Sequence, residues 1–173
     1  MNRLIGRHKE QAKLQTCMNS ERSEFVVVYG RRRIGKTFLV RRFFEDRYAF
    51  SFVGKHEMAK DLQLQEFAKA LQRYSVSAFV PVLKNWTEAF DGLQKLLASV
   101  ETPGKKVVFF DEMPWMDTPK SDFVMALENF WNGWANMRDD ILFVACGSAT
   151  SWMVDKLLHN QGGLFNRITQ KIY

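Results

Sequence analysis

Short apolar runs alternate along this chain with longer segments in which apolar residues recur every three or four positions. The short runs are rich in β-branched and aromatic residues, which is typical of buried parallel strands. Four such runs predict strands at 25–29, 48–53, 106–110 and 141–146. The last residues, 170–173, resemble the opening of a fifth strand.

The segments between these runs predict helices. Residues 36–47 predict one helix, and helix resumes after Thr150. Three further segments place their large apolar residues on one helical face each: Leu64, Phe67 and Leu71; Trp86, Phe90, Leu93 and Leu97; and Phe123, Leu127, Phe130, Trp131 and Trp134. Ser121 or Asp122 can cap the last of these helices. Alternating strands and helices predict an α/β fold of three layers, a parallel sheet flanked by helices, with ligands at the carboxyl ends of the strands.

Length and composition predict one domain over 1–173. With 173 residues, of which 46% are hydrophobic, the chain can bury one core but hardly two. It shows no apolar stretch near the roughly 18 residues of a membrane span and no secretory h-region, so we expect a cytoplasmic protein without membrane contact. Cys17 and Cys146 lack metal-ligand spacing and are expected to be reduced packing residues.

The chain carries a net charge of +6, which hints at polyanion binding. Part of the excess comes from five arginines that a nucleotide could account for: Arg31, Arg32, Arg33, Arg41 and Arg42.

A glycine-containing loop follows the first predicted strand. Residues 30–37 read Gly-Arg-Arg-Arg-Ile-Gly-Lys-Thr and fit the P-loop pattern G-x-x-x-x-G-K-[ST] in the strand-to-helix context that it requires. Gly30 and Gly35 let backbone N–H groups converge on phosphate oxygens, Lys36 can reach the β- and γ-phosphates, and the Thr37 hydroxyl can ligate Mg²⁺. The loop predicts a site for a purine nucleoside triphosphate, ATP in particular, with Mg²⁺. The residues predicted to contact the nucleotide here are Gly30, Arg31, Arg32, Arg33, Ile34, Gly35, Lys36, Thr37 and Phe38.

The third predicted strand delivers two acids at its carboxyl end, Asp111 and Glu112. Asp111 is predicted to hold Mg²⁺ through water, because Mg²⁺ retains several of its waters and binds few protein carboxylates. Glu112 can orient and partly deprotonate an attacking water, which favours hydrolysis over phosphotransfer to another acceptor. The alternative interpretation is a pair of helix-capping acids beyond a strand.

With these residues in place, the chain resembles the archaeal-type ATPase family of P-loop proteins, relatives of the AAA+ and STAND ATPases. The points of similarity, which span nearly the whole chain, are Ile5-Gly6-Arg7 followed by Glu10, Tyr29 with the arginine-rich loop 30–37, Phe110-Asp111-Glu112, and Cys146-Gly147-Ser148. The predicted strand 48–53, which lies between the two motifs, also suits the additional-strand, catalytic-glutamate class.

The resemblance implies roles for residues outside the two motifs. It places Ile5, Gly6 and Arg7 near the adenine, Ser148 at the polar sensor position near the γ-phosphate, and Arg167 as an arginine finger or sensor. Ser148 also has a physical argument, because the carboxyl end of a strand beside the phosphate strand faces the ligand crevice. A solvated or salt-bridged arginine remains the alternative for Arg167.

Members of this family usually continue into a helical lid, a winged-helix region and sometimes a nuclease-like domain, whereas this sequence stops at Tyr173. We therefore expect an ATPase core that is the N-terminal part of a longer protein, with its fifth strand truncated and the backbone of 26–29 left as an open sheet edge. A DNA or protein partner would be reached through the missing region, and homo-oligomer formation is open.

Three classes of function compete on these observations. The first is an ATP-hydrolysing or ATP-switching module that uses Lys36, Thr37, Asp111 and Glu112. The second is a nucleic-acid-binding module or nucleotide-sensing switch with little hydrolysis of its own. The third is a phosphotransferase, against which Glu112 argues.

Overall fold

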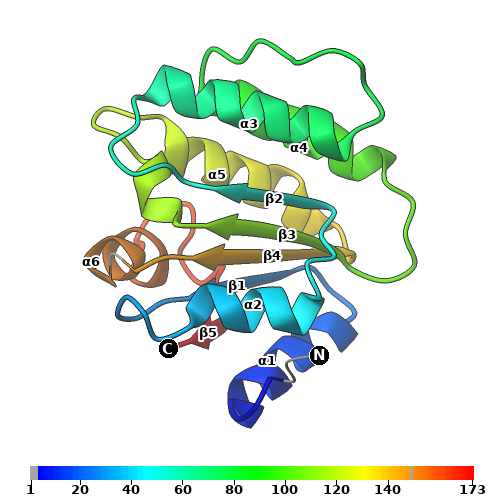
Figure 1. The fold of residues 1–173 in the computed structure, drawn as a ribbon, viewed down its shortest axis with the longest axis vertical. Coiled ribbons are helices and arrows are strands. Elements are labelled where there is room, and N and C mark those ends of the chain that lie inside the picture. The colour runs from blue at the N-terminus through cyan, green and yellow to red at the C-terminus, as the bar shows by residue number, and fades with distance from the viewer. Residues whose placement is uncertain (1–3, 149) are drawn as a thin grey trace.

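The computed structural model describes residues 4–148 and 150–173, which form a parallel sheet between two layers of helices (Figure 1). The helices and strands, in chain order, are α1 (His8–Asn19), β1 (Glu24–Val28), α2 (Lys36–Phe44), β2 (Phe50–Val53), α3 (Lys60–Tyr74), α4 (Trp86–Ser99), β3 (Lys106–Asp111), the 3₁₀ turn η1 (Met113–Met116), α5 (Phe123–Gly133), the 3₁₀ turn η2 (Ala135–Met137), β4 (Ile141–Cys146), α6 (Thr150–Trp152), the π-helical segment η3 (Met153–Leu158) and β5 (Gln170–Ile172). The predicted α/β fold is confirmed, and the predicted elements differ from these by a few residues at their ends.

The strand order across the sheet is β2-β3-β4-β1-β5, and all neighbours are parallel. β4 separates β1, which leads into the glycine-containing loop, from β3, which ends in the two acids. The additional strand between these two is therefore β4, whereas β2, the strand that sequence placed between the two motifs, lies beyond β3 at the edge of the sheet. The ends of β1, β4 and β3 meet at one edge of the sheet. A ligand bound at this edge can contact residues that follow all three strands.

Each face of the sheet packs against its own helices (Figure 1). Alternate residues of a strand point to opposite faces, so Phe25 and Val27 of β1 join the core under α3, α4 and α5, whereas Val26 and Val28 join the core under α1 and α2. Burial on both faces explains why the strands read as continuous apolar runs. Within the described residues, no helix combines the length and the apolarity that crossing a membrane needs.

The expectation of an open sheet edge at 26–29 is wrong. β5 pairs with β1 in the register Val26↔Gln170 to Val28↔Ile172, and the N–H of Tyr29 donates to the carbonyl of Ile172 at 2.9 Å. Three residues suffice to cover this backbone because the buried Ile172 side chain anchors the strand. The edge of the sheet is therefore β5 itself.

Ser121, one of the two predicted candidates, caps the start of α5, whereas Asp122 caps a different helix. Its carboxylate accepts the N–H groups of Trp86 and Thr87, each at 3.2 Å, in the first turn of α4. The N–H of Phe123 donates instead to the Ser121 hydroxyl at 3.1 Å. Asp122 thus joins the starts of α4 and α5, a contact between helices that local sequence does not predict.

Candidate functional site

The loop between β1 and α2 has glycine at both glycine positions of the P-loop pattern, and its conformation favours glycine there. Gly30 has φ of 126° and Gly35 has φ of 80°, values in which a side chain is strained. A Cβ on Gly30 would also come within 2.9 Å of Ile34 Cδ1. Gly35 directly precedes α2, whose first-turn N–H groups lack partners within the helix and favour an anion. The loop and the helix start form a cradle that suits phosphate groups.

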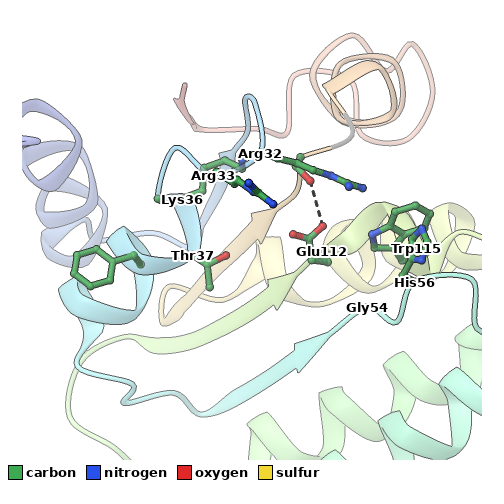
Figure 2. A pocket seen from close by; sticks show the side chains of 11 residues that line it. Arg32, Arg33, Lys36, Thr37, Gly54, His56, Glu112 and Trp115 are labelled. Atoms are coloured by element: carbon green, nitrogen blue, oxygen red, sulfur yellow. Dashed lines mark hydrogen bonds between the residues drawn. The ribbon is translucent and has the colours of Figure 1, made fainter.

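Lys36 lies against this loop and is nearly buried (Figure 2). Its Nζ donates to the carbonyls of Gly30 at 2.9 Å and Arg31 at 2.5 Å. The ammonium group is thus held at the opening of the loop, where it adds a full positive charge to the N–H groups of the cradle.

Thr37 and Asp111 bring the two sequence motifs together. The Thr37 hydroxyl donates to Oδ2 of Asp111 at 2.9 Å, and Oδ1 of Asp111 accepts the N–H of Glu112 at 2.9 Å. Asp111 is nearly buried at the end of β3. A hydroxyl and a carboxylate in contact offer the hard oxygen ligands that Mg²⁺ prefers, so these residues fit the predicted metal.

Cys146 lies beside this pair at the end of β4. Burial, followed by the negative charge of Asp111, raises the pKa of the Cys146 thiol well above its ordinary value. The thiol therefore stays protonated and acts as a packing group, as expected from the sequence.

Glu112 has a left-handed backbone with φ of 48° and a half-buried side chain. Its Oε2 lies 3.4 Å from the Oγ of Ser148, a contact that the dashed line at Glu112 marks in Figure 2. The fold thus brings the predicted sensor residue to the predicted catalytic acid from two different strand ends.

A cleft of about 630 Å³, within the range of small-molecule sites in proteins, is bordered by Lys36, Thr37, Glu112 and Ser148. Its lining residues are Arg32, Arg33, Gly35, Lys36, Thr37, Phe38, Gly54, His56, Glu112, Trp115 and Ser148. The cleft runs along the carboxyl ends of the strands and combines cationic groups near the loop with the Glu112 carboxylate. This combination suits a phosphate-bearing ligand.

Arg7 of the N-terminal segment contacts the loop between β1 and α2. The Arg7 guanidinium donates to the carbonyl of Ile34 in the loop, and the Gln11 side chain donates to the carbonyl of Gly6 at 2.7 Å. Ile5 is almost fully exposed. The lining of the cleft includes none of Ile5, Gly6 and Arg7, so their predicted proximity to adenine stays a prediction.

Other predicted residues also lie outside the cleft lining. Arg31 and Ile34 are exposed on the loop, and Arg167 is exposed in the segment before β5. Phe38 does line the cleft. Its ring is half-exposed, and the Arg42 guanidinium lies over it in a cation–π contact, 5.2 Å from the ring centroid. The role of Arg167 stays a prediction.

Three lining residues had no predicted role: Gly54, His56 and Trp115. The rings of His56 and Trp115 meet edge to face at 4.1 Å between centroids (Figure 2). The only signal for Gly54 was a glycine directly after a strand, which often marks close backbone approach. His56 lies in the loop after β2 and Trp115 lies in η1, and no pattern in the sequence relates them.

Comparison with known proteins adds a family assignment to this geometry. A family model described as an ATPase domain predominantly from Archaea matches residues 4–172. The uncharacterized ATP-binding protein MJ0423 of Methanocaldococcus jannaschii is 35% identical over 43 residues, which are 25% of this chain and 73% of that protein.

Solved structures share the fold at low sequence identity. The Walker-type ATPase PABY2304 of Pyrococcus abyssi superposes with a TM-score of 0.65 at 19% identity, covering 98% of this chain and 53% of that chain. Drosophila ORC bound to AT-rich DNA and Cdc6 gives a TM-score of 0.57 at 14% identity, over 95% of this chain and 55% of that chain. This chain thus spans about half the length of the Pyrococcus protein.

Proposed function

Because this chain belongs to the family of ATPase domains found predominantly in Archaea, we propose that it binds ATP with Mg²⁺ and hydrolyses the γ-phosphate bond, with Glu112 positioning the attacking water. The observation that carries this proposal is the placement of the Glu112 carboxylate. It borders the same cleft as Lys36 and Thr37, and it follows directly on Asp111 at the end of β3.

The loop residues bind and orient the phosphates in this proposal. Lys36 exchanges its backbone carbonyl partners for phosphate oxygens, and the first-turn N–H groups of α2 add further donors. Thr37 and Asp111 hold Mg²⁺, which when bound neutralises charge on the phosphate oxygens. Arg32 and Arg33 line the cleft and add positive charge.

Glu112 acts on water. Its carboxylate accepts a proton from a water molecule as that water attacks the γ-phosphorus, and the bond to the leaving ADP oxygen breaks. Ser148, at 3.4 Å from Glu112 Oε2, donates to the carboxylate and limits the directions in which it points. A half-buried acid that is restrained in this way is suited to holding one water in line.

Substitution of Glu112 by Gln tests this proposal. Glu112→Gln keeps the shape of the side chain, so we expect Mg·ATP affinity to persist and single-turnover hydrolysis to fall by roughly 10²–10⁴-fold. Glu101→Gln is the matched control, because Glu101 is exposed in the loop before β3, at the opposite end of that strand from Glu112. The longest soluble form of the protein should be used, since an arginine supplied in trans completes some P-loop sites.

Two results would count against hydrolysis through Glu112. Equal rates in the wild type and Glu112→Gln, both well above background, would remove this residue from the mechanism. Tight ATP binding without hydrolysis in the wild type would favour a nucleotide-sensing switch.

Nucleic-acid binding is a second candidate, favoured by the net charge of +6 and by the exposed Arg31 and Arg32 beside the cleft. The Drosophila ORC structures of similar fold are described as bound to DNA. DNA is therefore a proposed partner besides ATP. A protein partner and a second copy of this chain are proposed as well. Filter binding over a series of salt concentrations tests DNA binding, because phosphate contacts make affinity fall steeply with salt.

A further inference from the structure

Gln63 is a fully buried polar residue on α3. Its side-chain amide bonds to three backbone groups. Oε1 accepts the N–H of Lys55 at 3.1 Å, and Nε2 donates to the carbonyl of Met58 at 3.2 Å and to the carbonyl of Trp115. One amide thus ties the loop after β2 to the turn after β3.

Both tied segments contact the backbone of Glu112. The N–H of Trp115 donates to the Glu112 carbonyl at 3.1 Å. Gly54, the neighbour of Lys55, packs so closely on the same carbonyl that a Cβ would lie 2.2 Å from its oxygen. The Glu112 carbonyl is therefore held from two sides by segments that Gln63 joins.

Glu112 needs this support because its φ of 48° is unfavourable for a residue with a side chain. Such a conformation persists only where the surrounding contacts enforce it. If the Glu112 backbone relaxed to a negative φ, its side chain would project in a different direction. The contact between Glu112 Oε2 and Ser148 Oγ would then be lost.

We propose that Gln63 is a positioning residue for ATP hydrolysis, whose amide holds Glu112 in the conformation that aims its carboxylate into the cleft. This inference rests on the proposed function. Gln63 is not among the residues that line the cleft, so it acts through Gly54 and Trp115 and not on the nucleotide. An apolar residue of the same size would fill the space but would make no hydrogen bonds to the loop after β2 or to the turn after β3.

Replacement of Gln63 by Met tests the proposal, because methionine keeps the length of the side chain and removes all three hydrogen bonds. We expect Mg·ATP affinity to stay close to that of the wild type, while the single-turnover rate falls by about 10–100-fold, the scale of a displaced catalytic group. The matched control is Gln65→Met, the same substitution at an exposed position of α3, for which we expect the wild-type rate.

A second readout does not depend on hydrolysis. Hydrogen exchange at the Lys55 amide should be faster in Gln63→Met and unchanged in Gln65→Met, because only the first substitution removes its acceptor. If Gln63→Met does not fold, Gln63→Glu serves instead, since it keeps an acceptor for Lys55 and loses both donations; we expect a comparably slow rate.

The outcomes separate this proposal from the proposed function. If the wild type hydrolyses ATP and a folded Gln63 variant keeps the wild-type rate, the role of Gln63 is overturned and that of Glu112 stands. An equal loss of affinity and rate would show general damage to the site and would also overturn the positioning role. If the wild type itself hydrolyses no ATP, the proposed function fails and the positioning role fails with it, whatever the exchange data show.

Discussion

The Thr37 hydroxyl donates a hydrogen bond of 2.9 Å to the Asp111 carboxylate, across 74 positions of the chain. This contact links the start of α2 to the end of β3, although β4 separates β1 from β3. The two motifs recognised separately in the sequence are therefore joined by a pair of oxygen-bearing side chains, of which Thr37 lines the cleft.

Substitution of Asp111 by Asn should lower the affinity for Mg²⁺, so that ATP binding needs a higher Mg²⁺ concentration. The amide keeps an oxygen for the Thr37 hydroxyl but removes the charge, and changes at groups that hold a metal through water cost about 10–100-fold in metal affinity. Titration of Mg²⁺ at fixed ATP measures this shift. Asp91→Asn, at an exposed position of α4, is the control, and equal titrations for both variants would contradict the assignment.

Substitution of Lys36 by Ala should lower Mg·ATP affinity by about 100-fold or more while the protein stays folded. Removing one member of a desolvated charge pair costs on the order of 2–5 kcal/mol, which is the expected loss when the phosphates no longer meet the Lys36 ammonium group. Calorimetry checks the affinity and circular dichroism checks the fold. Lys95→Ala changes an exposed lysine of α4 and should bind like the wild type; unchanged affinity in folded Lys36→Ala would disprove the site.

Deletion of residues 170–173 should lower the melting temperature and promote self-association. It removes the buried Ile172, worth about 1.5–3 kcal/mol, and exposes the backbone of β1 as an apolar edge. Thermal unfolding and sedimentation velocity measure the two effects. Lys171→Ala keeps the strand and alters one exposed side chain, so it should sediment like the wild type. A deleted form that sediments like the wild type and is equally stable would refute the anchoring role of β5.

Asp140 should make stability depend on pH in the acid range. Its hydrogen bonds with Arg138, at 2.7 and 2.8 Å, and its ion pair with Lys106 at 3.0 Å lower the pKa of this carboxyl to about 2. Because the pKa in the unfolded chain is about 4, this stabilisation is complete above about pH 4 and is lost as pH falls towards 2.

Asp140→Asn should therefore lower the free energy of unfolding by roughly 2 kcal/mol at neutral pH and flatten its pH dependence between about pH 2 and 4. Denaturant unfolding at several pH values measures both effects. Asp139→Asn, at the exposed neighbouring position, is the control. Parallel curves for Asp140→Asn and the wild type would show that the pair does not stabilise the fold.

The sequence by itself determined the strands, the layers and the residue types of the two motifs. Buried strands had to be apolar on both faces, and 141–146 was predicted with the bounds of β4. Gly30 and Gly35 suit the loop because glycine adopts positive φ without strain, and the loop has positive φ at both positions. These are local requirements, which the residue types in one short segment already express.

Only the tertiary structure decided which groups meet. Sequence left Ser121 and Asp122 as equal candidates to cap α5, and the structure gives that cap to Ser121 while Asp122 bonds to the start of α4. The edge at 26–29 was expected to be open but is covered by β5. Gln63 carried no prediction, yet it joins two loops beside Glu112. The physical reason is that a polar side chain at the end of an element can satisfy several backbone groups equally well. Which of them it bonds depends on how distant segments pack, and residue spacing along the chain does not contain that information.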